Sequence, residues 1–340
     1  MKRCISCIIP YSFPGAKFDS AGECSICRRF RERDGLIPSL GKLRNRLDGI
    51  INENKGVNPK YDALVAYSGG KDSTFLVYTL KMKYGLNLLA FTFDNGFISG
   101  HAVSNIKTVL NKLDIDHIIF KPRYGLMAKI FAASADIPVY PVSLLKFGSA
   151  VCISCIRMVN NLALKTAVEK KIPMVMLGNS PGQLIQSENE LIYRDNMIPY
   201  ELKKSLFKPL SESIGSEIYD YFLLGEEQYK VKPFPYTVNP FPIIGYDEET
   251  IYRTIAKLGW QKPDDVDPNS TNCRLNSLGI IRHREKLNFH PYDYEMSMLV
   301  RLGIISREDA LKRVEDPDGR VPVIAEQVAE KLNRAQFLNP

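Results

Sequence analysis

Residues 62–73 read DALVAYSGGKDS, and this stretch decides the fold. The apolar run from 62 to 67 is followed by turn residues, which predicts a short buried strand. Residues 72–84 then repeat apolar side chains with helical spacing. The hexapeptide SGGKDS therefore joins a strand to the start of a helix. At such a junction, backbone N–H groups and the helix dipole favour the binding of an anion such as a phosphate.

The predicted loop also carries the side chains that bind phosphate. Its glycines let backbone N–H groups curl around an anion, Lys71 adds a positive charge, and the serine hydroxyls can donate hydrogen bonds. The loop is not a Walker A motif, because Asp72 follows the lysine. A cation that bridges phosphates needs a nearby carboxylate, so Asp72 is the candidate for a Mg²⁺ shell. We expect the nucleotide to contact Ser68, Gly69, Gly70, Lys71, Asp72 and Ser73, with Lys71 and Asp72 in catalytic roles.

Strands and helices alternate along the following residues. The pattern predicts strands at 62–67, 86–93, 117–121 and 173–177, and helices at 72–84, 100–113, 123–134 and 152–170. This alternation predicts an α/β fold, a parallel sheet with helices on both faces. Because strand ends line the ligand crevice in such sheets, we expect Asp94, Gly178 and Asn179 to contact the nucleotide.

The pattern weakens from 183 to 245. The proline-rich and aromatic stretch 230–242 predicts an extended insertion or a substrate-facing loop. Helices are expected at 247–258 and 293–315. We therefore divide the chain into a metal-binding segment (1–36), a linker helix within 37–60, a nucleotide domain (61–182), and its continuation with a helical C-terminus (183–340).

The seven cysteines fall into two sets. The first has the spacing Cys4-x2-Cys7-x16-Cys24-x2-Cys27, which is typical of two zinc knuckles that present four thiolates to one structural Zn²⁺. The second consists of Cys152-x2-Cys155 and the distant Cys273. These three could bind a metal or an iron–sulfur cluster with one open position, form a redox pair with a bystander, or be small buried residues. The functional alternatives require Cys273 to fold back beside the pair.

Composition excludes several classes of protein. Among the 340 residues, 45% are hydrophobic and 24% are charged, which is the profile of a globular protein rather than a disordered or coiled-coil chain. No uninterrupted apolar run approaches a membrane span, and the N-terminus has no signal peptide pattern. We therefore expect a cytoplasmic protein with reduced thiols. The net charge is +7, of which residues 1–60 contribute +6, so a nucleotide, a phosphosugar or RNA is a fitting partner, although the basic face could simply be solvated.

The hexapeptide SGGKDS after a strand resembles the PP-loop of the ATP pyrophosphatase superfamily. The resemblance implies an adenine nucleotide alpha hydrolase-like fold. It also implies a reaction in which a carbonyl-type oxygen of the substrate attacks the α-phosphate of ATP, pyrophosphate leaves, and a nucleophile then displaces AMP.

Two more specific resemblances compete. The N-terminal CxxC with FDSAGECSIC at 18–27, and LGIISREDA at 302–310, look like the N-acetyl sugar amidotransferases, which implies ammonia from a separate glutaminase as the nucleophile. The order PP-loop, Cys152, Cys155 and Cys273 resembles the tRNA thiolases, in which three cysteines hold a 4Fe-4S cluster that carries a sulfide. The chain departs from the thiolases in two ways. It lacks a second, C-terminal zinc knuckle, and GNSPGQ at 178–183 replaces an acidic pair at the strand end.

The sequence thus predicts an AMP-forming enzyme that inserts sulfur, with nitrogen insertion as the alternative and a zinc-containing RNA-binding protein without activity as a third interpretation. The expected cofactors are ATP, Mg²⁺, Zn²⁺ and a 4Fe-4S cluster. The expected partners are a small-molecule acceptor, sugar-linked or not, or an RNA, together with a sulfur or ammonia donor protein. A homodimer is also compatible with these patterns, and no membrane is expected.

Overall fold

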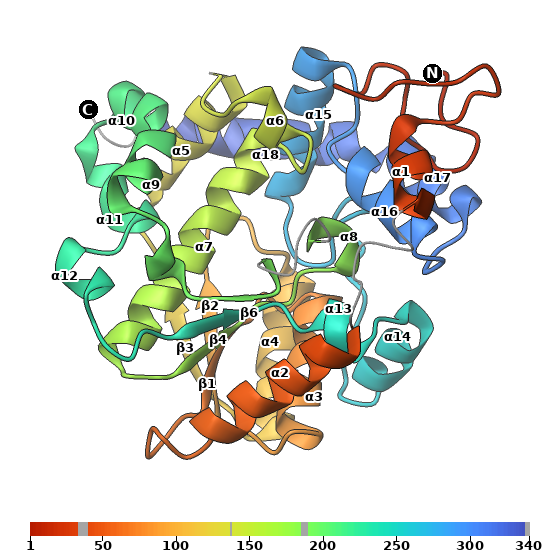
Figure 1. Cartoon of the computed structure of the whole chain (residues 1–340). Helices are drawn as coiled ribbons and strands as arrows, with labels where there is room; N and C mark the ends of the chain where they lie inside the picture. Colours follow the sequence, from red (N-terminus) through yellow and green to blue (C-terminus); the bar gives the residue numbers. More distant parts are fainter. Residues whose placement is uncertain (33–39, 137, 185–189, 337–340) are drawn as a thin grey trace.

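The structure is a computed structural model that describes residues 1–32, 40–136, 138–184 and 190–336. Its centre is a six-stranded sheet with the order β3-β2-β1-β4-β6-β5 (Figure 1). The strands are β1 (Ala63–Ala66), β2 (Leu88–Phe93), β3 (Asp116–Phe120), β4 (Met174–Met176), β5 (Ile192–Tyr193) and β6 (Tyr236–Val238). All pairings are parallel except that of β5 with β6. The predicted α/β fold with a mostly parallel sheet is confirmed.

The central strands are apolar on both faces because both faces are covered. In β1, Leu64 faces one core cluster, while Ala63 and Val65 face the other. All six residues of β2 are buried. This is why the strands read as short continuous apolar runs rather than as alternating ones.

Helices cover both faces of the sheet (Figure 1). One face packs against α2 (Leu40–Asn54), α3 (Lys71–Met82), α4 (Gly100–Leu113), α13 (Phe241–Ile244) and α14 (Glu248–Ala256). The other packs against α5 (Tyr124–Asp136), α7 (Ala150–Glu169), α10 (Lys208–Ile214), α11 (Tyr219–Phe222), α15 (Leu275–Leu287) and α18 (Arg320–Gln336). The remaining helices are α1 (Ser25–Glu32), α6 (Val142–Leu145), α8 (Pro181–Leu184), α9 (Tyr200–Leu206), α12 (Glu226–Tyr229), α16 (Asp293–Arg301) and α17 (Arg307–Glu315).

Helix α7 is the one helix in the described part of the chain that is long and apolar enough to cross a membrane. Arg157 and Lys165 interrupt its apolar run. Helices α5, α11 and α15 and strands β1, β2 and β4 pack against it, and more than half of its apolar stretch is buried. We therefore assign it as a core helix of the α/β fold.

The segment from 183 to 245, where the sequence pattern weakens, contains α9 to α12, and Phe207, Leu210 and Phe222 join the main core. Within 230–242, three residues form β6, and the stretch then enters α13. None of the residues 230–242 lines the main cavity, so this stretch is not substrate-facing there.

The predicted helix at 293–315 is two helices, α16 and α17. The chain turns between them at Gly303, which has a φ of +69°, a conformation that favours glycine. Ser306 then caps α17, since its side chain accepts a hydrogen bond from the Asp309 N–H.

The paired helices α15 and α18 were not predicted. Residues 37–39 of the predicted linker segment (37–60) lie outside the described residues, and its helix, α2, begins at Leu40.

The N-cap of α17 gives a test of the separation between α16 and α17. Replacing Ser306 with alanine removes the side-chain acceptor for the Asp309 N–H, and it should lower the free energy of unfolding by about 1 kcal/mol in urea denaturation. Ser306→Thr keeps the hydroxyl and should cost much less. Equal losses in the two variants would contradict the assigned helix start.

Candidate functional site

The SGGKDS loop leaves β1 after Ala66 and enters α3 at Lys71. Gly69 has a φ of +74°, and a Cβ on it would lie 2.5 Å from the carbonyl oxygen of Ala102 in α4. Trp260 Nε1 donates to the Gly69 carbonyl at 2.9 Å. The loop is therefore fixed closely against its neighbours, and glycine is required at position 69.

Lys71 lies in a network of charges that sequence reasoning missed. Its Nζ is 2.8 Å from Asp72 Oδ1 and 3.2 Å from Glu248 Oε1, and it also contacts the Tyr246 hydroxyl. Arg313 pairs with Glu248 from the other side. Burial disfavours the Lys71 cation, but Asp72, Tyr246 and Glu248 outweigh it and raise the pKa of Lys71 well above its usual value. Lys71 is therefore a fixed positive charge at the loop.

A cavity of about 630 Å³ extends from this loop along the carboxyl edge of the sheet. Of the predicted nucleotide contacts, it is lined by Ser68, Gly70, Lys71, Asp72, Ser73, Gly178 and Asn179. Asp94 does not line it, because its carboxylate pairs with Lys121 at 3.2 Å and accepts from the Gly96 N–H. Gly69 is likewise turned away, toward α4.

The structure brings Cys152, Cys155 and Cys273 to this same cavity. Cys152 and Cys155 lie in the first turns of α7. Cys273 lies beside the segment that follows β2, held by a bridge with Ile98. The side-chain nitrogen of Asn95 is 3.4 Å from Cys155 Sγ and 3.5 Å from Cys273 Sγ, so these two sulfurs share one donor.

Two asparagines contact the cavity sulfurs, one as a hydrogen-bond donor and the other as an acceptor. Asn95 Oδ1 accepts from the Phe97 N–H at 2.8 Å, so the amide nitrogen of Asn95 must face the sulfurs of Cys155 and Cys273. The nitrogen of Asn276 donates to both carboxylate oxygens of Asp267. Its oxygen therefore accepts from the Cys152 thiol at 3.0 Å, and also from Tyr292.

Burial keeps the cavity thiols neutral. It raises the pKa of Cys152 to about 12 and raises the pKa values of Cys155 and Cys273 above their usual range. Burial also raises the pKa of Asp267 to about 6. A bound metal would have to displace these thiol protons, because only the thiolate is a metal ligand.

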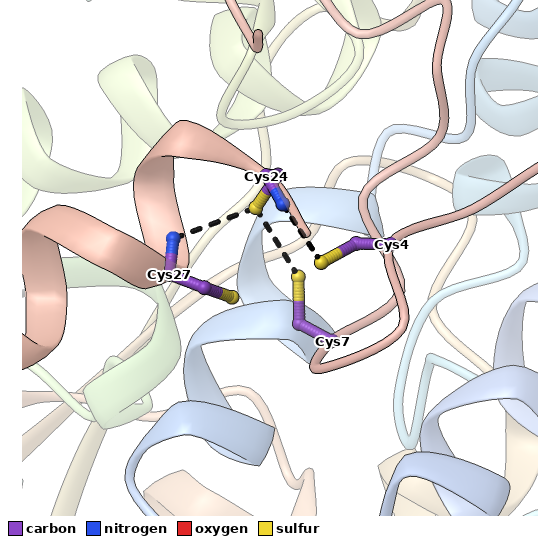
Figure 2. A group of neighbouring side chains, drawn as sticks. All are labelled: Cys4, Cys7, Cys24 and Cys27. Atoms are coloured by element: carbon purple, nitrogen blue, oxygen red, sulfur yellow. Dashed lines mark hydrogen bonds between the residues drawn. The ribbon is translucent and has the colours of Figure 1, made fainter. Parts of the chain in front are cut away.

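The N-terminal cysteines form a separate, closed group (Figure 2). The four sulfurs of Cys4, Cys7, Cys24 and Cys27 all lie within 4.8 Å of one another. The Cys7 and Cys24 sulfurs are 3.8 Å apart, as thiolates are around one tetrahedral Zn²⁺, where each lies about 2.3 Å from the ion. All four residues are buried. Nothing in this arrangement leaves a coordination position open to substrate, so a metal there would be structural.

Helix α16 connects this cysteine group to the cavity. On one side Arg3 pairs with Asp293 at 2.6 Å, the Ile8 N–H donates to Ser297, and the half-buried Arg301 approaches the sulfurs of Cys7 and Cys27. On the other side, Glu295 of the same helix and Tyr292, the residue before its start, line the cavity. The N-terminal segment therefore fixes a wall of the site.

The residues that sequence reasoning missed are Asn95, Tyr246, Glu248, Asn276, Tyr292, Glu295 and Arg313. Asn95 carried a usable signal, because it lies two residues after the predicted strand 86–93. The others come from helices or their flanking residues far away in the sequence, and their residue types alone did not distinguish them from surface side chains.

The proximity of Cys155 and Cys273 can be tested directly. In metal-free protein, a short thiol cross-linker such as dibromobimane should join them, because both sulfurs contact the same Asn95 nitrogen. Peptide mass spectrometry identifies the joined pair. Cys273→Ser should remove that product, whereas Cys24→Ser should not. Failure to recover the pair in reduced, folded protein would contradict the geometry.

Comparisons with known proteins give distant matches. No protein-family model matches the chain. It is 24% identical to an uncharacterized protein of Methanocaldococcus jannaschii over 297 residues, which is 87% of this chain and 86% of that protein. It is 32% identical to cytoplasmic tRNA 2-thiolation protein 1 of Drosophila willistoni over 100 residues, which is 27% of this chain and 29% of that protein.

Solved structures give matches of low similarity. The tRNA thiolase NcsA of Methanococcus maripaludis, solved with its 4Fe-4S cluster, has a TM-score of 0.35 and 16% identity, over 98% of this chain and 88% of that one. The NMN synthetase of Francisella tularensis has a TM-score of 0.27 and 14% identity, over 74% and 93%. The strand–loop–helix context expected for SGGKDS is confirmed, since the loop joins β1 to α3 in a parallel sheet.

Proposed function

We propose that the chain is an ATP-dependent, AMP-forming enzyme that activates a carbonyl-type oxygen of its acceptor and replaces it with sulfur. The observation that carries this proposal is that the SGGKDS loop and Cys152, Cys155 and Cys273 line one cavity. Activation and sulfur transfer must happen at the same carbon, so the two sets of residues have to be neighbours. An ammonia-using enzyme has no such need for thiols beside its nucleotide.

The loop supplies what a pyrophosphate leaving group needs. The backbone N–H groups at the start of α3 and the Lys71 cation would hold the β- and γ-phosphates. The Lys71 N–H now donates to the Thr271 hydroxyl at 3.1 Å, so that oxygen stands where a phosphate oxygen would accept. Asp72, which lies beside Lys71, is the carboxylate that would join a Mg²⁺ shell.

The cavity thiols fit an iron–sulfur cluster better than a single ion. Among the described residues, only the N-terminal group places its sulfurs at single-ion spacing. Three thiolates would leave one iron without a protein ligand, and such a cluster would present sulfide to the activated acceptor. Asn95 would donate to two ligand sulfurs. If Cys152 were a thiolate ligand, its proton would have left to solvent, and Asn276 Oδ1 would still have Tyr292 as a donor.

RNA is the acceptor that we favour, and a cytoplasmic location follows with it. The local match to a cytoplasmic tRNA 2-thiolation protein supports both. The +6 net charge of residues 1–60 would attract a polyanion. We assign Zn²⁺ to the N-terminal cysteines as a structural ion, and we expect a separate protein to supply the sulfur.

The first test of this function is the fate of ATP. With tRNA isolated from cells that lack this chain, the protein should convert ATP to AMP and pyrophosphate. Gly70→Ala should abolish this, because a Cβ there would lie 2.9 Å from the Thr271 hydroxyl and narrow the space for phosphate. Gly100→Ala, at a position with nothing within 4 Å, is the matched control. Formation of ADP would refute the proposal.

Metal analysis separates the two cysteine sets. Anaerobically purified protein should hold about one zinc and about four irons with matching sulfide per chain. Cys24→Ala should lose the zinc, and Cys273→Ser should lose the iron and keep the zinc. If the N-terminal set holds the iron, or if Cys273→Ser leaves iron and sulfide unchanged, the assignment is wrong.

A further inference from the structure

The cavity contains a carboxylate that the proposed function has not used. Glu295 of α16 lines the cavity wall, and its Oε1 accepts from the Ser180 hydroxyl at 2.6 Å. Ser180 belongs to the stretch 178–183 that follows β4, the stretch in which the sequence has no acidic residue. Residues 178–183 supply no carboxylate at this edge of the sheet. The Glu295 carboxylate, from a helix distant in the sequence, lies there instead.

The contact between α16 and this stretch is tight. A Cβ on Gly182 would lie 2.7 Å from the Glu295 carbonyl oxygen and 2.9 Å from its Cγ. Glycine at 182 therefore lets the two helices α8 and α16 approach closely. From behind, Asp293 and Ser297 of α16 are held by the N-terminal segment. The Glu295 side chain is fixed in place rather than free to swing.

Glu295 differs from the other carboxylates of the cavity in having no strong partner. Asp72 pairs with Lys71, and Asp318 pairs with Arg320. Glu248 is held by Lys71 and Arg313.

Asp267 has no cation, but both of its oxygens accept from the Asn276 amide. Among the described residues, Glu295 is in no ion pair within 4.0 Å, and its neutral hydrogen-bond partners are the hydroxyl of Ser180 and the side chain of Gln183. It is therefore the cavity carboxylate that is free to accept a proton.

The proposed activation step needs a proton acceptor. A neutral amide oxygen is a poor nucleophile, and it becomes a good one when the adjacent nitrogen loses its proton. We propose that Glu295 takes the N–H proton of a lactam or secondary amide in the acceptor while the neighbouring carbonyl oxygen attacks the α-phosphorus of ATP. The proposal rests on the proposed function and names its acceptor class as an N–H–C=O group.

The step balances without any other reagent. The nitrogen–hydrogen bond breaks, its electron pair forms the carbon–nitrogen double bond, and the proton goes to the Glu295 carboxylate. The carbonyl π electrons form the new oxygen–phosphorus bond. The bond from the α-phosphorus to the bridging oxygen breaks, and pyrophosphate leaves with that electron pair. The products are an O-adenylated acceptor, pyrophosphate and a protonated Glu295.

The surroundings of Glu295 suit this role. Burial raises its pKa above the usual range, and Asp72 from α3 adds to this, while the hydroxyl of Ser180, Lys71 and the side chain of Gln183 oppose it. Tyr292, the residue before the start of α16, is the other titratable group that faces it. A raised pKa makes the carboxylate a stronger base. The rate should therefore fall as the pH drops through the pKa of Glu295, because the protonated acid cannot accept a second proton.

The test measures pyrophosphate release over a range of pH, with saturating ATP and tRNA from cells that lack this chain. Glu295→Gln preserves the side-chain size and an acceptor for Ser180 but cannot take the proton. The rate should fall by about 10²- to 10⁴-fold, the acid limb of the pH profile should disappear, and ATP binding should be unchanged. Added formate should restore part of the rate in Glu295→Ala. Glu308→Gln, on an exposed part of α17, is the control that should behave as the wild type.

The outcomes separate the two proposals. If wild-type protein releases pyrophosphate and Glu295→Gln does so within about threefold, the assignment of Glu295 is overturned and the proposed function stands. The assignment is also overturned if Glu295→Gln is slow but keeps the acid limb of the pH profile and formate does not restore the rate of Glu295→Ala. Glu295 would then have a structural role only. An N-acetylated sugar, tested as a second acceptor, distinguishes an acetamido group from a nucleobase. If neither acceptor supports pyrophosphate release, the proposed function fails, and this assignment fails with it.

Discussion

The parallel pairing of β1 with β2 and β4 is the constraint on which the rest of the site depends. Parallel strands end at the same edge of a sheet, so the segments that leave these three strands meet there. One is the SGGKDS loop, one carries Asn95, and one carries Gly178 and Asn179. The SGGKDS loop and the hydrogen-bond donor to the sulfurs are adjacent because the strands are parallel.

A second layer is supplied by helices from the C-terminal half. Helix α14 begins at Glu248, which holds Lys71, and Asn276 of α15 approaches Cys152. Helix α16 places Glu295 beside Ser180 and is held on its far side by the N-terminal cysteine segment. The N-terminal cysteine group thus supports one wall of the cavity from the side that faces away from it.

The sequence was informative where local chemistry is decisive. Apolar runs followed by glycine predicted β1 and the loop, and paired CxxC motifs predicted the N-terminal sulfur group, because four thiols gather only around tight turns. The sequence was uninformative for elements whose formation depends on tertiary packing. The helices between 200 and 229 are short, and the burial of Phe207 and Phe222 in the main core stabilises them. Glu295 could not be found, because no spacing links position 295 to position 180; only the close approach at Gly182 does.

The central claim is that the acceptor's own oxygen is transferred to the adenylyl group. The most direct measurement uses an acceptor labelled with ¹⁸O at its carbonyl, with mass spectrometry of the AMP formed in one turnover. The account predicts that AMP carries the label, because sulfur displaces the labelled oxygen together with the AMP. AMP without label, with the ¹⁸O retained in the acceptor or released to water, would contradict adenylation of the acceptor and with it the proposed reaction.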